Sequence, residues 1–247
     1  MSFTDRFADR AGDYVVARPS YPDAALDVLF DGMGDPREVV VADLGAGTGI
    51  SSRLLARRGA HVIAIEPNEP MRAAAEPDPN VEWRAGTAEH TGLEEAEVDL
   101  VTAFQAFHWF DHVRALDEIV RILRPGGRAA VVYNERDESD PFTAAYGALV
   151  RRYQTDETER RRADGLAAFE TFEGWVAKRR VELSNGQTFD VEGVVARSRS
   201  TSYLPQTGPV ADELHAAIRE LVAQYVRDSR VTMALRTIVV AADVGAG

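Results

Sequence analysis

Residues 39–49 have the sequence VVVADLGAGTG. The three valines predict a strand that is buried on both faces. Gly45, Gly47 and Gly49 follow at once, so the strand must end in a tight turn where positive φ or close backbone approach requires glycine. Residues 48–58 have apolar side chains at helical spacing, which predicts a helix. A strand, a glycine turn and a helix start together are expected to expose backbone N–H groups to a ligand.

The spacing of the glycines bears on the kind of ligand. Dinucleotide-binding turns have the pattern G-x-G-x-x-G, whereas this turn has G-x-G-x-G, with Asp43 two residues before the first glycine. A pyrophosphate favours positive potential, so a carboxylate beside the turn would repel it. An acid at this position suits a ligand with cationic groups, such as the ammonium and sulfonium of a methionine derivative.

A second acid follows the second predicted strand. Residues 60–65 predict that strand, and Glu66 comes directly after it, 21 residues beyond Gly45. At about this distance, doubly wound folds place an acid that accepts hydrogen bonds from ribose hydroxyls. Glu66 is therefore predicted to bind the ribose of a nucleoside. The alternative is that Glu66 only caps the next helix.

Three further strands, at residues 81–85, 98–104 and 128–133, alternate with helical segments. This alternation predicts a parallel sheet with right-handed crossovers. Ligands bind at the carboxyl ends of the strands in such sheets. The residues expected around one crevice are Asp43, Glu66, the loop 86–89, Gln105 to Trp109 and Asn134.

Several motifs resemble those of one enzyme family. Residues 43–49 resemble the S-adenosyl-L-methionine-binding signature of class I methyltransferases. Residues 105–111 (QAFHWFD) are similar to a string found in a branch that includes trans-aconitate methyltransferase-like proteins. Residues 123–127 (LRPGG) resemble the turn before the fifth strand of that superfamily. The resemblance implies an α/β fold with a Rossmann-like, doubly wound, seven-stranded sheet. In that fold the sheet is mostly parallel, the last strand is antiparallel, and helices cover both faces.

The resemblance also implies a small-molecule methyltransferase that uses S-adenosyl-L-methionine and releases S-adenosyl-L-homocysteine. Asp43 would bind the methionine end of the cofactor, Glu66 would bind the ribose, and Ala88 and Glu89 would bind the adenine. Tyr14 and Arg18 would close over the methionine carboxylate. The cofactor-binding residues expected in full are Tyr14, Arg18, Asp43, Gly45, Ala46, Gly47, Gly49, Glu66, Pro67, Thr87, Ala88, Glu89, Gln105 and Ala106.

The whole chain, residues 1–247, is expected to form a single domain. Residues 1–36 would be an N-terminal lid or strap, and residues 37–134 the cofactor-binding core. Residues 135–205 would cover the substrate, and residues 206–247 would supply a closing helix and strand. Within the cover, residues 154–164 are highly charged and predict a solvated face or mobile segment. Asn185-Gly186 lies between two apolar runs and predicts a turn.

His108 is the candidate catalytic residue, because it follows the fourth strand at the expected crevice. It could act as a general base or orient an acceptor carboxylate, or it could merely pack beside Trp109. Residues 108–112 loosely resemble a zinc-binding H-x-x-E-H motif, but Asp111 suits a helix cap better, so no metal is expected. Arg197 and Arg199 bracket Ser198 and could bind an acidic substrate. The expected substrate-binding residues are His108, Trp109, Asn134, Arg199 and Tyr203.

Composition narrows the choice of partners. The 247-residue chain has a formal net charge of -12, which opposes binding to nucleic-acid backbones. It has no cysteine, so disulfides, thiolate metal sites and a cysteine nucleophile are excluded. No apolar run approaches the ~20 residues of a membrane helix. We therefore expect a cytoplasmic enzyme with a small-molecule substrate and without nucleic-acid or membrane partners, and its oligomeric state stays open.

Two other functions remain at this stage. The chain could be an NAD-dependent oxidoreductase, although the glycine spacing and Asp43 disfavour it, or a non-catalytic nucleoside-binding module. For a methyltransferase, the first candidate acceptor is a small carboxylic acid and the second is a phenol or an alcohol.

Overall fold

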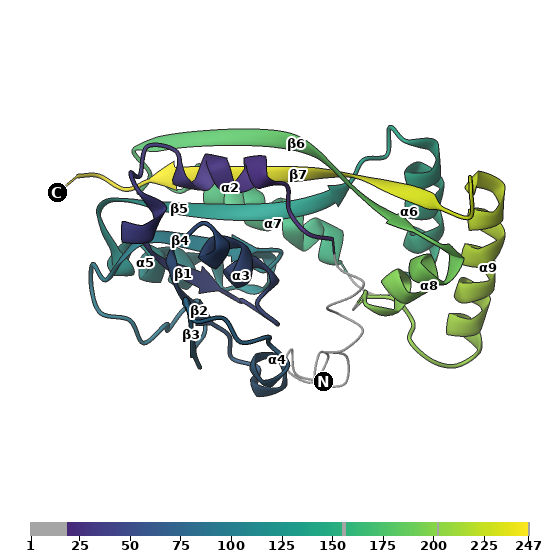
Figure 1. Cartoon of the computed structure of the whole chain (residues 1–247), viewed down its shortest axis with the longest axis horizontal. Helices are drawn as coiled ribbons and strands as arrows, with labels where there is room; N and C mark the ends of the chain where they lie inside the picture. The colour runs from purple at the N-terminus through teal and green to yellow at the C-terminus, as the bar shows by residue number, and fades with distance from the viewer. Residues whose placement is uncertain (1–18, 155–156, 202, 247) are drawn as a thin grey trace.

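Seven strands form one sheet in the part of the chain that the computed structural model describes, which is residues 19–154, 157–201 and 203–246. The strands are β1 (Val40–Leu44), β2 (His61–Ile65), β3 (Val81–Arg84), β4 (Val98–Phe104), β5 (Leu123–Arg136), β6 (Ala177–Phe189) and β7 (Val231–Asp243). Their order across the sheet is β3-β2-β1-β4-β5-β7-β6 (Figure 1). Strands β1 to β5 pair in parallel, whereas β7 pairs antiparallel with β5 and with β6. The predicted sheet, mostly parallel with an antiparallel last strand, is confirmed.

Helices cover both faces of the sheet. They are α2 (Asp23–Phe30), α3 (Ile50–Arg57), α4 (Glu69–Ala73), α5 (His112–Ile122), α6 (Pro141–Tyr153), α7 (Thr158–Thr171), α8 (Val191–Arg199) and α9 (Pro209–Tyr225), with short 3-10 helices η2 (Pro36–Glu38) and η3 (Phe107–Trp109). Helices α2 and α3 pack on the face that carries Val41 and Leu100. Helices α5 and α7 pack on the face that carries Ala42 and Val101. Successive strand residues point to opposite faces, so a strand between two helix layers needs a continuous apolar run. Among the described helices, none has the length and apolar character needed to cross a bilayer.

A second, smaller core lies beyond one end of the sheet. The far ends of β6 and β7 extend past their neighbours and meet α6, α8 and α9 (Figure 1). Buried side chains from all five elements join there, including Phe142, Val194, Leu214 and Met233. Helices α6, α8 and α9 therefore bury their apolar faces against one another and against the far ends of β6 and β7, apart from the main core.

Two strands are longer than the sequence predicted. Asn185 and Gly186 form no turn: they pair with Leu235 and Ala234, and β6 continues through them as one strand. The prediction of a turn was wrong because the apolar runs on either side of it both pair with β7 and not with each other. Strand β5, predicted over 128–133, extends at both ends, because its partners β4 and β7 continue to supply hydrogen bonds.

The charged segment after Tyr153 begins helix α7. The first two turns of α7 are mostly solvent-facing, in line with the predicted solvated face. The following turns bury Leu166 and Phe169 against the main core, and Phe107 meets Phe169 edge-on at 5.6 Å. Helix α7 therefore packs over η3, the short helix that follows the fourth strand.

Glu118 on α5 ties the loop after β3 to that helix. It accepts hydrogen bonds from Thr91 N (3.0 Å), Thr91 Oγ1 (2.5 Å) and Arg121 Nε (2.7 Å). The Arg121 bond is the largest cause that lowers the pKa of Glu118 to about 2, although burial opposes it. The ionised form is therefore preferred in the folded state.

We expect Glu118→Gln to lower the free energy of unfolding at neutral pH by about 1 kcal/mol, the usual contribution of a hydrogen bond. A depressed pKa stabilises the fold above the unfolded-state pKa, and this contribution disappears as pH falls from 4.5 towards 2. Urea unfolding of both proteins at a series of pH values measures it, with the exposed Asp117→Asn as a control. A difference that stays constant down to pH 2 would contradict this assignment.

Candidate active site

Two positions in the turn after β1, Gly45 and Gly49, require glycine. Gly45 has φ 67° and Gly49 has φ 78°, both in the left-handed region. A Cβ atom on Gly45 would lie 2.7 Å from the Cβ of Ala106, and one on Gly49 would lie 2.7 Å from Trp83. The chain after β4 and the side chain of Trp83 can therefore press against the turn.

The N–H groups of this turn donate into the protein. Gly45 N and Ala46 N both donate to Ile65 O, at 2.9 and 3.2 Å. Gly47 N donates to Glu66 Oε2 at 2.9 Å, and Gly49 N donates to Ala46 O at 2.9 Å. The expectation that the turn offers these N–H groups to a ligand is corrected, because the end of β2 already accepts three of them. The arrangement lacks the open amide cradle that a pyrophosphate needs.

Glu66 is buried at the carboxyl end of β2. Its Oε1 accepts from Asn68 N at 2.9 Å, while Oε2 holds Gly47 N. Burial raises the pKa of Glu66, and the two backbone bonds and Arg72 oppose that rise. A carboxylate oxygen accepts more than one hydrogen bond, so both oxygens remain able to accept from a pair of hydroxyl groups.

A cleft of about 820 Å³ opens between this turn, β2, β4 and the loop after β3. The cleft is lined by Gly45, Gly47, Glu66, Pro67, Asn68, Met71, Thr87, Ala88, Glu89, Phe104, Gln105, Ala106, Trp109 and Phe110. Nine of the predicted cofactor-binding residues are among them: Gly45, Gly47, Glu66, Pro67, Thr87, Ala88, Glu89, Gln105 and Ala106.

Other predicted residues lie elsewhere. Ala46 lines a small adjoining cavity with Pro19 and Tyr21. Gly49 does not line the cleft and lies against Trp83 at the end of the turn. Tyr14 and Arg18 lie outside the described residues.

Asp43 has a different place from the one predicted. It is 0% exposed and lines none of these cavities. Its carboxylate accepts from Ser51 Oγ (2.7 Å), Ser52 Oγ (2.7 Å) and Thr102 Oγ1 (2.9 Å). Burial raises the pKa of Asp43, and the three hydroxyl donors partly offset the rise. The predicted direct contact with the ligand is corrected: Asp43 fastens α3 and β4 to the end of β1 and so holds the turn in place.

The cleft is apolar and acidic. Met71, Ala88 and Phe110 supply apolar surface, while Glu66 and Glu89 are its charged residues. No Lys or Arg is among the described residues that line it. Glu89 Oε1 accepts from Asp111 N at 2.8 Å. Met71 and Phe110 were not predicted from the sequence, because only the fold brings the helix after Glu66 and the loop after η3 to the same wall.

Gln105 stands between the cleft and a second, larger space. It has φ 55°, an uncommon value for a residue other than glycine. Its backbone N donates to Val132 O (2.9 Å) and its Nε2 donates to Asn134 O (3.0 Å), which fixes the strained residue between β4 and β5. Gln105 lines both spaces. Such strain is common at functional sites.

The second space, which we term the arginine chamber, encloses about 1,030 Å³. It is lined by Gln105, Asn134, Glu135, Arg136, Glu138, Arg151, Glu159, Arg162, Ala163, Arg197, Thr201, Tyr203 and Leu235. Most of these residues come from β5, α6, α7, α8 and the segment after α8, and Gln105, Glu138 and Leu235 come from the loop after β4, the loop after β5, and β7, respectively. The segment after residue 134 thus closes a polar chamber beside the cleft.

Of the substrate-binding residues predicted, Asn134 and Tyr203 line the arginine chamber and Trp109 lines the cleft. Arg199 is exposed and lines neither space, whereas Arg197 lines the chamber. The prediction of Arg199 is corrected, because two residues apart on a helix differ in direction by about 200°.

His108 lies behind the wall of the cleft. It is 6% exposed and lines neither space. His108 N donates to Tyr133 Oη at 3.0 Å, His108 Nδ1 lies 3.3 Å from the same oxygen, and the imidazole packs on Trp109 with ring centres 4.7 Å apart. The expectation that His108 faces the crevice is corrected. The structure instead matches the alternative of a histidine that packs beside Trp109.

The H-x-x-D-H motif has the predicted helix cap. Asp111 precedes α5, and its Oδ1 accepts from Arg114 N at 3.3 Å. The ring of His112 stacks on Phe107 with centres 5.2 Å apart. Within the described ranges, no three His, Asp or Glu side chains are grouped to hold a metal ion.

The region around the cleft is similar to a known protein family. Residues 42–131 match the protein family described as "Methyltransferase domain". This stretch is similar to known methyltransferase domains. It contains the glycine turn, Glu66, the loop after β3 and η3, so the whole wall of the cleft lies within it.

Three proteins show how far the similarity extends. An uncharacterized methyltransferase of Mycobacterium tuberculosis is 41% identical over 150 residues, 59% of this chain and 59% of the relative. The chain thus matches about 59% of that relative's length. The solved structure of a candidate type II methyltransferase from Anaeromyxobacter dehalogenans is 27% identical, has a TM-score of 0.68, and aligns over 93% of this chain and 97% of that one. The phosphoethanolamine N-methyltransferase 2 of Haemonchus contortus, solved with S-adenosyl-L-methionine, shares the fold at 17% identity. Its TM-score is 0.57, over 99% of this chain and 60% of that one.

Proposed function

We propose that this protein is an S-adenosyl-L-methionine-dependent methyltransferase that acts on an oxygen atom, carboxylate or hydroxyl, of a small-molecule acceptor. This proposal rests on two features considered together. The N–H groups of the glycine turn donate into the protein, and the charged residues that line the cleft are Glu66 and Glu89. Among the described residues that line the cleft, a pyrophosphate would meet carboxylates and no cation. A cationic ligand with two ribose hydroxyls and an adenine amino group would meet one carboxylate for the hydroxyls and one for the amino group.

The residues of the cleft fit the parts of such a ligand. Glu66 would accept from the ribose hydroxyls, as its two oxygens have room for further hydrogen bonds. Met71, Ala88 and Phe110 would enclose the adenine, with Glu89 as acceptor for its amino group. Gly45, Gln105 and Ala106 would flank the methionine end. We propose Tyr14 and Arg18 for its carboxylate.

The acceptor would enter from the arginine chamber. Residues 37–134 would then act as the cofactor-binding core and residues 135–205 as the cover over the acceptor, with residues 206–247 completing the unit. Asn134, Trp109 and Tyr203 are the proposed acceptor-binding residues. Gln105, fixed between β4 and β5, would keep the acceptor oxygen in line with the methyl group.

Methyl transfer requires little from the protein beyond this alignment. The acceptor oxygen donates a lone pair to the methyl carbon, the carbon–sulfur bond breaks, and its electron pair stays on sulfur in S-adenosyl-L-homocysteine. A carboxylate acceptor loses no proton, whereas a hydroxyl must give one to a base. Alignment of reacting atoms contributes up to ~7–11 kcal/mol in well-oriented systems.

Transfer to a small molecule is tested directly by incubating the protein with a metabolite extract and S-adenosyl-L-methionine that is deuterated at the methyl group. We expect mass spectrometry to find the deuterated methyl group in a small molecule, and only when active protein is present. Heat-inactivated protein is the control. Label that appears only in macromolecules, or nowhere, would contradict the proposal.

The pH dependence of turnover distinguishes the two kinds of acceptor oxygen. We expect a flat profile between about pH 6 and 8, because a carboxylate is already ionised there. His108→Asn should retain most of the activity, since His108 lines neither the cleft nor the chamber. A fall in rate as pH drops through ~6.5, lost in the variant, would identify His108 as the base and contradict the carboxylate assignment.

A further inference from the structure

The arginine chamber holds a cation without a described counterion. Arg162, on the second turn of α7, has no carboxylate within ion-pair distance among the described residues, and its Nε is buried without a hydrogen-bond partner. Arg136, opposite it on β5, is more constrained. It forms ion pairs with Glu159 and, through Nε at 3.7 Å, with Glu138, and its Nη1 donates to Tyr203 Oη at 3.4 Å.

Positive charge exceeds negative charge around the chamber. Four arginines and three glutamates line it, and Arg151 already binds Glu138 through two hydrogen bonds of 2.6 and 3.1 Å. These arginines also act on the buried Tyr203 hydroxyl. Burial alone would raise the pKa of Tyr203, but Arg162, Arg136 and Arg197 outweigh it and lower that pKa. An excess of arginine in a partly enclosed space favours an anionic ligand.

The cations stand apart from the cleft. Arg136, Arg162 and Arg197 line the chamber but not the cleft, and Gln105 is the residue that the two spaces share. A group held by the arginines therefore lies on the far side of Gln105 from the methyl donor. An oxygen that shares its charge with guanidinium donors is also a weaker nucleophile than a free one.

We propose that the methyl acceptor carries an anionic oxygen group, a carboxylate or a phosphate, that binds Arg162 and Arg136 beside Tyr203. A second group of the same molecule reaches past Gln105 and receives the methyl group. This inference rests on the proposed function and deepens it, because it makes the acceptor a two-ended molecule with an anionic anchor. The anchor fixes the position of the other end, and alignment is the main contribution of the enzyme.

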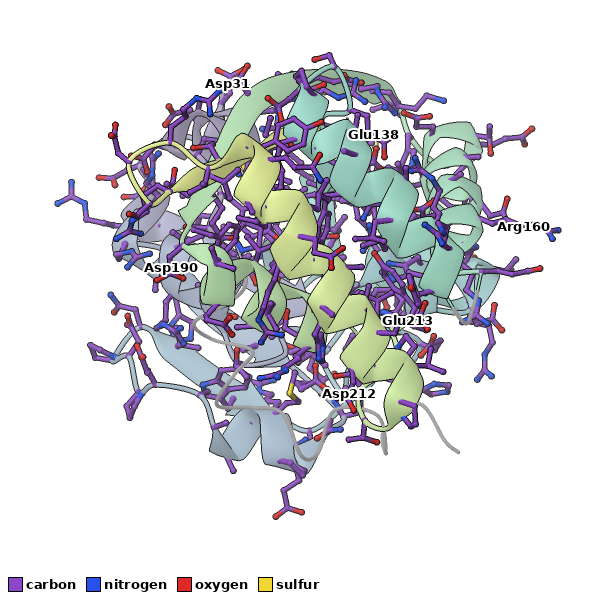
Figure 2. The ribbon with its side chains drawn as sticks, turned by 90° about the vertical axis from the view of Figure 1, so that its right-hand side faces the viewer. Asp31, Glu138, Arg160, Asp190, Asp212 and Glu213 are labelled. Carbon is purple, nitrogen blue, oxygen red and sulfur yellow. The ribbon has the colours of Figure 1, made fainter. Side chains whose placement is uncertain are left out.

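Binding of simple anions tests the anchor without knowledge of the acceptor. Protein saturated with S-adenosyl-L-homocysteine is titrated with inorganic phosphate and, separately, with acetate, at constant ionic strength. We expect Arg162→Gln to weaken binding of the preferred anion at least about tenfold, the usual effect of losing a charged hydrogen bond. Arg160→Gln is the matched control on the same helix. The Arg160 side chain is 71% exposed and lies at the outer edge of the molecule in Figure 2.

Anion affinity tests this inference, and affinity for S-adenosyl-L-homocysteine tests the proposed function, so failure of one can be distinguished from failure of the other. Preference for phosphate would indicate a phosphate ester and preference for acetate a carboxylic acid, and either supports the anchor. Equal anion affinity in wild type and Arg162→Gln, with unchanged melting temperatures, would overturn it. The affinity for S-adenosyl-L-homocysteine is measured in the same samples and should be unchanged in Arg162→Gln. Absence of that binding in every protein would instead overturn the proposed function. Arg162→Lys, which keeps the charge, should recover part of the anion affinity.

Discussion

Replacing Glu66 with glutamine is expected to weaken binding of S-adenosyl-L-homocysteine about 10- to 100-fold. The substitution replaces a charged acceptor by an amide at the residue that also holds Gly47 N, and a hydrogen bond to a charged group contributes about 1.5–3 kcal/mol. Isothermal titration calorimetry measures the affinity. Glu95→Gln removes one negative charge from an exposed position and serves as the control. Full affinity in a folded Glu66→Gln protein would mean that the ribose lies elsewhere.

Replacing Asp43 with alanine is expected to lower the free energy of unfolding by about 3 kcal/mol or more. The change leaves the hydroxyls of Ser51, Ser52 and Thr102 buried without their acceptor, and each unsatisfied group costs about 1–3 kcal/mol. Urea unfolding measures the loss, with Asp117→Ala, an exposed aspartate on α5, as the control.

Asp43→Asn refines this prediction. The asparagine oxygen can still accept from two of the three hydroxyls, so its loss of stability should be smaller than that of Asp43→Ala. Ligand affinity, measured where each variant is folded, should change less than in Glu66→Gln, because Asp43 acts through the turn. Unchanged stability in Asp43→Ala would contradict the proposal that Asp43 holds α3 and β4 to the end of β1.

The sequence predicted the sheet and much of the cleft because both depend on local signals. Apolar runs that end in Asp43 and Glu66 define strands, and the carboxyl ends of parallel strands meet at one edge of a sheet. Spacing along the chain therefore placed Glu66 and Ala88 correctly on one wall. It could not give the direction in which a side chain points. Asp43 occupies the expected position, yet its carboxylate turns into the core towards three hydroxyls.

The arginine chamber could not be predicted from the sequence, for a different reason. Its walls come from β5, α6, α7 and α8, which only tertiary packing brings together. Arg162 belongs to a charged segment whose composition indicates nothing more than a solvated face. Arg197 and Arg199 differ only in helical phase, so the choice between them required the orientation of α8. The long β6–β7 pair, which carries the second core, likewise depends on pairing between distant segments.

The acid-lined cleft is expected to bind S-adenosyl-L-methionine and not a dinucleotide. Calorimetric titration of the wild-type protein with S-adenosyl-L-homocysteine and, in parallel, with NAD⁺ measures this difference. We predict saturable binding of S-adenosyl-L-homocysteine at one site per chain and no detectable binding of NAD⁺. Binding of NAD⁺ without binding of S-adenosyl-L-homocysteine would contradict this expectation.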